Sequence, residues 1–215
     1  MILCRKASSL LGLSLLIAVF SFAHVSFGDD ELINVVEPNG SFEQDYVGWW
    51  HGISDGAEAI MSIDDKDAID GDKCAYIEVV TVTGTNWHVG IGHSELTLFE
   101  GEKYTADFYA KADVPRVISM EIKVSPPDPY ENITETNVNI NEEWAEFSQS
   151  FVPARDYSAI AQIDFWLGQV VGEVWIDGVR VYEGDKQDRE DDSPQISVAA
   201  KGKLTTTWAS IKSPD

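Results

Sequence analysis

The chain has 215 residues, of which 37 are acidic and 15 are basic, so its formal net charge is −22 at neutral pH. Such a charge disfavours nucleic acid and anionic lipid as partners, because both are bound through Lys and Arg side chains that neutralise phosphate. Neutral glycans and divalent cations remain compatible with it.

Residues 1–28 have the layout of a secretory signal peptide. Arg5 and Lys6 precede an almost unbroken apolar run over residues 10–20, and small residues then come just before an acidic stretch. This order predicts a secreted protein, extracellular or in the cell envelope, cleaved after Gly28 and with no membrane span in the mature chain. An uncleaved membrane anchor is the alternative.

Residues 29–184 are expected to form one all-β domain. Apolar and polar residues alternate with a period of two, and no window shows a sustained helical stripe. Six runs of strand length stand out, at residues 74–82, 103–112, 116–124, 146–152, 159–167 and 173–182. Turn-forming clusters separate them, and about ten short strands at this spacing predict a sandwich or barrel. An antiparallel jelly-roll β-sandwich is the fold we expect.

The alternation also assigns strand faces. One face of residues 162–167 is apolar and is expected to be core, whereas the other carries Gln162, Asp164 and Trp166. In residues 120–123 the apolar pair is expected to point inward and the charged pair outward. An indole beside an amide and a carboxylate suits a sugar site. The C–H face of a pyranose packs on the indole, while its hydroxyls need fixed donors and acceptors.

The C-terminal part is predicted to lie outside the domain. Residues 185–195 are charged and lack apolar side chains, which indicates a solvated acidic linker. Residues 196–215 form a tail with basic residues and one Trp, to which the sequence assigns no role. Only Cys74 lies beyond residue 28, so no internal disulfide is expected.

Several motifs follow one another in a fixed order between residues 34 and 184. They are Asn39–Glu43 with Trp49 and Trp50 after it, then residues 70–77, 86–89, 98–111, Trp144 with its strand, and residues 165–179. In this order and spacing the chain resembles the carbohydrate-binding modules of the CBM4, 9, 16 and 22 group (CBM_4_9, galactose-binding-like). The resemblance covers nearly the whole predicted domain. It implies a jelly-roll sandwich that binds polysaccharide or oligosaccharide without catalysis, in a family that commonly accompanies glycoside hydrolases.

The resemblance also implies a structural calcium that links the N-terminal segment to the last strand. Matching positions give Glu43, Asp70 and Asp177 as carboxylate ligands, with the backbone carbonyl of Lys73. Calcium takes six to eight oxygen ligands of these kinds, so the chemistry is suitable. The alternative is that acids are so abundant in this chain that any few of them would resemble ligands.

The sugar site implied by the resemblance centres on Trp87, which stands where the family often presents a stacking aromatic. A ring that plugs the sandwich edge is the alternative. Together with the exposed strand face, the candidate sugar-binding residues are Trp87, Trp166, His88, Asp164 and Gln162. Many relatives carry a polar side chain two or three residues after this Trp, whereas this chain has Gly90, which leaves the polar part of the site undefined.

The other tryptophans are assigned by position. Trp144 and Trp175 match framework positions of the family, so we expect them to serve in packing. Trp49 and Trp50 are neighbours in the chain, and neighbours in a strand point to opposite faces. One of that pair is therefore expected to face solvent.

Catalytic signatures are mostly missing. The sequence lacks HExxH and a Gly-rich phosphate loop, and Cys74 lies in a strand pattern typical of a core position. A pair of carboxylates for glycoside hydrolysis stays open among 37 acids, but a sandwich of this size leaves little room for a catalytic cleft. We expect no intrinsic enzymatic activity. The alternatives are an adhesion or cell-envelope protein that uses the same sandwich for protein contacts, and an accessory part of a glycoside hydrolase.

Overall fold

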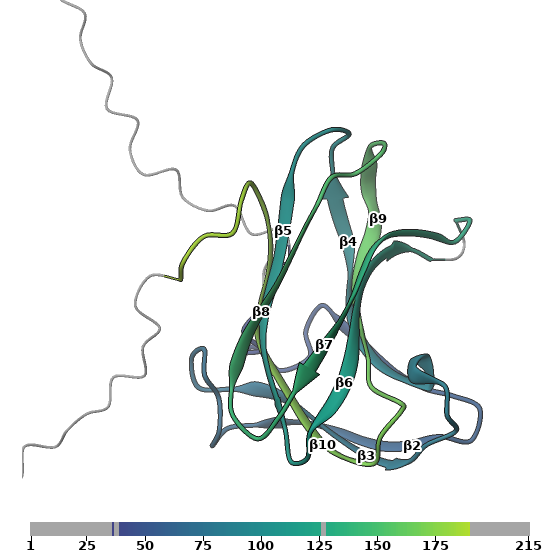
Figure 1. Cartoon of the computed structure of the whole chain (residues 1–215), viewed down its shortest axis with the longest axis vertical. Helices are drawn as coiled ribbons and strands as arrows, with labels where there is room; N and C mark the ends of the chain where they lie inside the picture. The colour runs from purple at the N-terminus through teal and green to yellow at the C-terminus, as the bar shows by residue number, and fades with distance from the viewer. Residues whose placement is uncertain (1–35, 37–38, 126–127, 190–215) are drawn as a thin grey trace, which may run out of the picture. The chain divides into compact units, whose positions relative to one another are not determined.

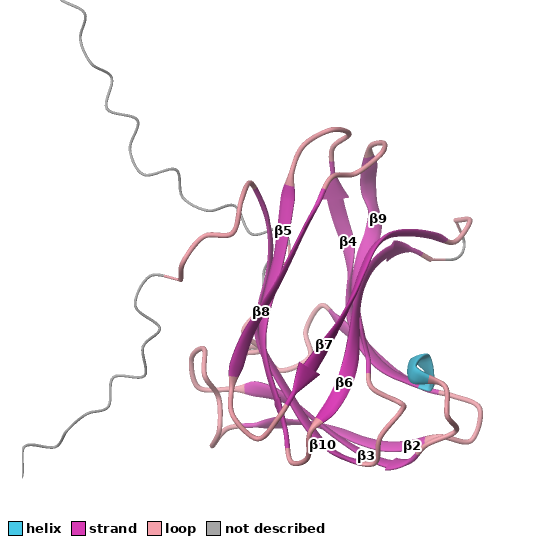
Figure 2. Ribbon diagram, viewed as in Figure 1, coloured by secondary structure: helices cyan, strands magenta, loops and turns pink. Residues whose placement is uncertain are grey.

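The computed structural model describes residues 36, 39–125 and 128–189 (Figure 1). More than half of this part is strand, and its single helical turn is drawn in cyan in Figure 2. The strands are β1 (Trp49–Ile53), β2 (Glu58–Asp64), β3 (Cys74–Thr81), β4 (Val89–Leu98), β5 (Tyr104–Ala112), β6 (Arg116–Val124), β7 (Glu131–Ile140), β8 (Ala145–Phe151), β9 (Tyr157–Trp166) and β10 (Gly172–Glu183). The helical turn η1 (Asn86–His88) comes just before β4. Among the described residues, no helix has the length and apolar character needed to cross a membrane.

The strands form two five-stranded sheets. The front sheet has the order β1-β4-β9-β6-β7, and the back sheet has the order β2-β3-β10-β5-β8. Every pair of neighbouring strands is antiparallel. Non-consecutive strands therefore lie side by side in both sheets, and the antiparallel β-sandwich expected from the sequence is confirmed.

The core lies between the two sheets. Phe108 of β5 and Phe165 of β9 meet edge to face with their ring centroids 4.8 Å apart, which joins the back sheet to the front sheet. Trp49 of β1 packs beside the same phenylalanine at 6.4 Å. The apolar faces predicted for residues 162–167 and 120–123 are buried here. Burial of this apolar surface is the main favourable contribution to folding, since no disulfide is present in the described part.

The six predicted strands correspond to β3, β5, β6, β8, β9 and β10, with ends that differ by at most two residues. The other four strands lack an apolar run that would have marked them. In β4 the alternation is interrupted by Gly90 and Gly92, and in β7 most residues are polar because the strand lies at a sheet edge.

The motif Asn39–Glu43 forms a turn held by one asparagine side chain. Asn39 Nδ2 donates to two backbone carbonyls of residues 45 and 47, at 2.7 and 3.0 Å, and its own carbonyl accepts from Trp49 Nε1 at 2.8 Å. Phe42 has a positive φ of 57° and is fully buried, with its ring 4.6 Å from that of Trp49. Trp49 is thus core and Trp50 lies on the outer face, as the alternation predicted.

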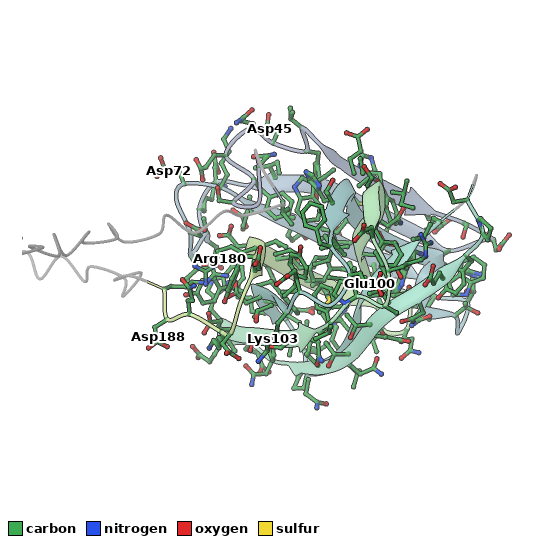
Figure 3. The ribbon with its side chains drawn as sticks, turned by 90° about the horizontal axis from the view of Figure 1, so that it is seen from above. Asp45, Asp72, Glu100, Lys103, Arg180 and Asp188 are labelled. Atoms are coloured by element: carbon green, nitrogen blue, oxygen red, sulfur yellow. The ribbon has the colours of Figure 1, made fainter. Side chains whose placement is uncertain are left out.

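Residues 185–189 lie on the back sheet, whereas the sequence had indicated a solvated linker from residue 185. Arg189 donates to Asp107 Oδ1 at 2.6 Å and to the carbonyl of Gly178, and its side chain is only 5% exposed. Lys186 Nζ pairs with Glu146 Oε2 at 2.5 Å. In Figure 3 the labels of Arg180 and Asp188 mark this part of the molecule, near the end of the described chain. The physical reason is electrostatic, because the basic residues of the segment form ion pairs with carboxylates of the sheet, and the carboxylate of Asp107 is fully buried.

The other predicted boundaries lie outside the described residues. These are the signal peptide at residues 1–28, the rest of the linker at 190–195 and the tail at 196–215.

Candidate functional site

A groove with a volume of about 400 Å³ opens on the outer face of the front sheet. It is lined by Asn86, Trp87, Glu121, Lys123, Tyr130, Glu135 and Trp166. These residues come from η1, from β6, β7 and β9, and from the residue just before β7. The groove therefore lies across neighbouring strands and depends on their register.

The register places the side chains of the outer face in rows across all five strands. One row reads Trp50, Gly92, Asp164, Glu121 and Glu135 from β1 to β7, and the next reads Gly52, Gly90, Trp166, Ser119 and Asn137. Each row combines an indole with polar groups and has a glycine on β4. The predicted face of Gln162, Asp164 and Trp166 is thus joined by residues that are distant in sequence.

The glycines of β4 make room for the two indoles. A Cβ added at Gly90 would overlap the Trp166 ring, and one added at Gly92 would come within 2.6 Å of Trp50 Nε1. The rings of Trp50 and Trp166 accordingly lie over this strand with their centroids 5.7 Å apart. Where many relatives have a polar side chain, this chain has Gly90, and the space above that glycine is occupied by the Trp166 ring.

Trp166 is held from the opposite side by β6. Its Nε1 donates to Glu121 Oε2 at 2.8 Å, and Lys123 Nζ lies 4.3 Å from its ring centroid. The ammonium group is close enough for a cation–π contact, which covers part of the indole. Trp166 is therefore partly covered by protein side chains and forms the floor of the groove, so its ring face is not fully open to a ligand.

The charged pair of β6 faces outward as predicted but is nearly buried. Glu121 is 6% exposed and Lys123 is 8% exposed, because neighbouring side chains surround both. Glu121 Oε1 accepts hydrogen bonds from Tyr130 Oη and from Asn132 Nδ2. Lys123 Nζ lies 3.7 Å from Glu121 Oε2 and 2.8 Å from Asp164 Oδ2. The floor of the groove is thus a connected network of charges and not a solvated surface.

Asp164 lies under the groove and is fully buried, so it does not line the groove. Gln162 Nε2 donates to both of its oxygens, at 2.9 and 2.7 Å. Burial raises the pKa of Asp164 to about 6, while the hydrogen bonds from Lys123 and Gln162 act in the opposite direction. Asp164 and Gln162, both predicted to contact sugar, are therefore placed to orient Lys123.

Two exposed aromatic rings stand at the groove. Trp87 is 52% exposed and Tyr130 is 60% exposed, and both line it. Asn86 positions the first ring, since its Oδ1 accepts from Trp87 N at 2.8 Å and its Nδ2 reaches Ser119 Oγ on β6 at 3.2 Å. Sequence reasoning identified Trp87 and missed Tyr130, which follows a proline-rich turn and carries no strand signal.

His88 is buried, and both of its ring nitrogens have protein partners. Nδ1 lies 2.5 Å from Thr83 Oγ1, and Nε2 lies 3.2 Å from Asp55 Oδ2. The Trp87 ring meets the imidazole edge to face at 4.2 Å. His88 was predicted to donate a hydrogen bond to sugar, but this geometry makes it a support for the Trp87 ring.

The predicted calcium ligands meet at one turn, residues 69–73. Asp177 Oδ2 accepts from two backbone amides of this turn at 2.9 Å each, and Glu43 Oε1 accepts from two others at 2.7 and 2.9 Å. Asp70 and Lys73 belong to the turn itself. The structure therefore brings the N-terminal turn, this loop and β10 together, as the resemblance implied.

The carboxylate and carbonyl oxygens at this turn are the kind of ligand that calcium takes. The side chains, however, do not form a metal-binding cluster. In the part of the chain that the structure describes, no three His, Cys, Asp or Glu side chains converge to hold a metal. A cation would need backbone carbonyls, such as that of Lys73, beside Glu43 and Asp177. Asp177 is fully buried, and that burial raises its pKa to about 7. A bound cation would favour its charged form.

The expected framework tryptophans pack on the outer face of the back sheet. Lys111 Nζ lies 4.6 Å from the Trp175 ring centroid and 5.2 Å from that of Trp144. Trp175 Nε1 donates to Asp64 Oδ2 at 2.9 Å, and Trp144 Nε1 donates to the carbonyl of Asp67 at 3.1 Å. Both indoles thus have their polar atoms satisfied and a cation against their rings.

A family model described as "Carbohydrate binding domain" (CBM_4_9) matches residues 37–172. A solved structure described as "CBM4 structure and function" is 26% identical with a TM-score of 0.60, over 68% of this chain and 99% of that one. The CBM22-1 xylan-binding domain of Paenibacillus barcinonensis Xyn10C is 11% identical, with a TM-score of 0.52, over 73% of this chain and 97% of its own. The CBM22-1–GH10 modules of Clostridium thermocellum xylanase 10B are 15% identical, with a TM-score of 0.51, over 72% and 29%. The last two show the fold alone. A search of curated proteins finds no match.

Proposed function

Because this chain belongs to the carbohydrate-binding domain family CBM_4_9, we propose that it binds a polysaccharide or oligosaccharide in the groove of the front sheet, without catalysis. Families of this kind bind sugar through a surface and leave bond cleavage to other domains. The proposal concerns which residues form that surface in this chain and how they act.

The observation that carries the proposal is the placement of two exposed aromatic rings, Trp87 and Tyr130, at a groove with a polar floor. A pyranose ring presents apolar C–H faces and a rim of hydroxyls, so it needs a flat ring to stack on and fixed polar atoms beside it. Glu121, Glu135 and Asn86 provide carboxylate and amide groups within the same groove.

Protein contact by the same sandwich is the competing function. It would be favoured if Trp87 and Trp166 were buried or lay on a flat apolar patch. Instead both line a groove, and the residues between them are charged or polar. This supports the sugar-binding proposal over adhesion through protein contacts.

Replacement of the exposed ring tests the proposal. In affinity gels that contain soluble β-glucan, xylan or mannan, the folded protein should be retarded by at least one of the glycans. Trp87→Ala should weaken that binding at least tenfold, which corresponds to about 1.4 kcal/mol. Phe99→Ala is the matched control, because Phe99 is 54% exposed but does not line the groove. The proposal fails if no glycan retards the protein or if both variants behave alike.

We also propose that calcium binds at the turn 69–73 through Glu43, Asp70, Asp177 and the carbonyl of Lys73. The hydrogen bonds that hold the carboxylates of Glu43 and Asp177 against the backbone of this turn support it. Removal of metal by a chelator should lower the melting temperature, and added calcium should restore it, because a ligand of the native state stabilises by about 2.7 kcal/mol at 100 times its Kd. Glu43→Gln should reduce the calcium-dependent shift. An unchanged melting temperature after thorough chelation would contradict this site.

Export completes the proposal. The layout of residues 1–28 and the family, whose members accompany glycoside hydrolases, support a protein that acts outside the cytoplasm or in the cell envelope. Its polysaccharide ligand, and an enzyme or envelope component as a second partner, would be met there.

A further inference from the structure

The groove contains more acids than bases. Among the residues that line it, Glu121 and Glu135 are acidic and Lys123 is the one base, and the buried carboxyl of Asp164 lies directly beneath. In and beneath the groove, three carboxyl groups therefore stand against one ammonium group. A charged ligand would meet this imbalance at short range, where the low dielectric of a partly enclosed site strengthens electrostatic interactions.

The one cation is already committed to protein partners. Lys123 Nζ is 2.8 Å from Asp164 and 3.7 Å from Glu121, and it rests against the Trp166 ring. With 8% of the residue exposed, it has little surface to offer a ligand. To pair with an anion, the ammonium would have to leave a buried carboxylate, which is costly because the buried charge would be left alone.

Glu135, in contrast, remains able to accept hydrogen bonds from a ligand. Glu135 is exposed at the groove, and its one hydrogen bond given by the structure is a long one, 3.4 Å, from Asn132. A carboxylate has about four acceptor positions, so Glu135 can receive hydroxyl protons from a sugar. Neutral sugar hydroxyls are donors, whereas a carboxylate or sulfate on the sugar offers acceptors only. The chain as a whole adds a repulsive field for anions, since its net charge is −22.

From these contacts we infer that the groove selects by charge: it takes neutral glycan chains and rejects chains whose sugars carry carboxylate or sulfate groups. This inference rests on the proposed sugar-binding function of the same groove. It makes Glu135 a specificity-determining residue. It also gives the Lys123–Asp164 pair the task of keeping the one cation among the described lining residues unavailable to a ligand.

The test compares two derivatives of one glycan that differ in charge alone. Whichever of β-glucan, xylan or mannan binds is prepared in hydroxyethyl and carboxymethyl forms of equal substitution. We expect the carboxymethyl form to bind at least tenfold more weakly at low salt, and the difference to shrink with added salt, which screens charges beyond about 10 Å at 0.1 M. Equal binding of the two forms would overturn the inference and leave the proposed function in place. Absence of binding by the neutral parent glycan would overturn both.

Two matched variants separate the groove from the overall charge. Glu135→Gln and Glu102→Gln each remove one negative charge, and Glu102 is exposed in the turn between β4 and β5, outside the groove. We expect Glu135→Gln to reduce the ratio of the affinities for the hydroxyethyl and carboxymethyl forms severalfold. Glu102→Gln should leave that ratio nearly unchanged. If both variants reduce it equally, the effect belongs to the net charge of the chain and the inference is wrong.

Discussion

The two outer faces of the sandwich use similar side chains with different results. On the back sheet Lys111 lies against the rings of both Trp144 and Trp175. On the front sheet Lys123 covers Trp166, while Trp87 and Tyr130 stay exposed beside a groove. The presence of Trp, Lys and acids on a strand face therefore does not by itself make a binding site. What matters is which rings stay exposed, as Trp87 and Tyr130 do, although Lys123 Nζ also lies 5.9 Å from the Tyr130 ring centroid.

A second difference is the cover that the chain provides. Residues 185–189 lie across the back sheet, where Arg189 joins Arg180 at the fully buried Asp107. Arg189 also lies over the Tyr109 ring, 4.3 Å from its centroid. Within the described residues, the chain's own segment thus covers the part of the back face around Asp107, whereas the front face carries a groove.

Asp107→Ala should damage the back face alone. It leaves Arg180 and Arg189 without their buried carboxylate, and removal of one partner from a buried ion pair costs about 3–5 kcal/mol. Urea unfolding measures the loss, and glycan affinity at a temperature where the variant is folded should match that of the unchanged protein. Asp185→Ala, which removes an exposed partner of Lys103, should cost less than about 1 kcal/mol. A large loss of glycan affinity in Asp107→Ala would show that the two faces are not independent.

Asp164 should make the stability of the front face depend on pH. Its pKa is raised from 3.8 to about 6 by burial, so its neutral form is favoured in the folded state. The corresponding stability is fully present below about pH 4 and is lost as the pH rises through about 6, by at most about 3 kcal/mol. The groups that face it are Lys123 and Glu121 on β6 and Gln162 on β9.

The measurement is the free energy of unfolding of the protein and of Asp164→Asn between pH 4 and pH 8. The unchanged protein should lose stability relative to the variant across the window from pH 4 to 6, because the variant has no carboxyl group to ionise there. The prediction is refuted by parallel curves for the two proteins.

Gly90→Ala should disturb the groove through one methyl group. The added Cβ would overlap the Trp166 ring and lie 2.9 Å from the carbonyl of Phe165, so the indole must shift. Overpacking of this kind costs about 1–3 kcal/mol, and glycan affinity should fall as the floor of the groove moves. Gly52→Ala is the control on the same face, because its Cβ would meet Trp50 at an ordinary 3.5 Å. Equal affinity in the two variants would contradict the role assigned to Gly90.

Much of the fold could be predicted from the sequence, and less of the site. Strands such as β6 and β9 were found because one face is continuously apolar, which is a local signal. Trp87 and Trp166 were found through family resemblance and strand alternation, and both line the groove. Tyr130 was missed because its place at the groove comes from a hydrogen bond to Glu121 of β6, which no local pattern indicates.

Local patterns also misjudged burial. Asp164 was expected on an open face, and it is fully buried, with Lys123 and Glu121 of the neighbouring β6 beside it. His88 was expected to face sugar, but Asp55 and Thr83 occupy its nitrogens. Burial depends on neighbours across the sheet, and a period-two pattern specifies only which side of a strand a residue faces.

The sequence by itself determined the acidity, the all-β class, the strand faces and the family, because composition and alternation are properties of short segments. The tertiary structure alone decided that β4 lies between β1 and β9, so that its glycines receive two indoles. It also decided that Lys123 is held by Asp164 and that Arg189 pairs with Asp107 on the back face. These features depend on the register between strands that are distant in the chain. No local pattern encodes that register, because packing of the whole sandwich sets it.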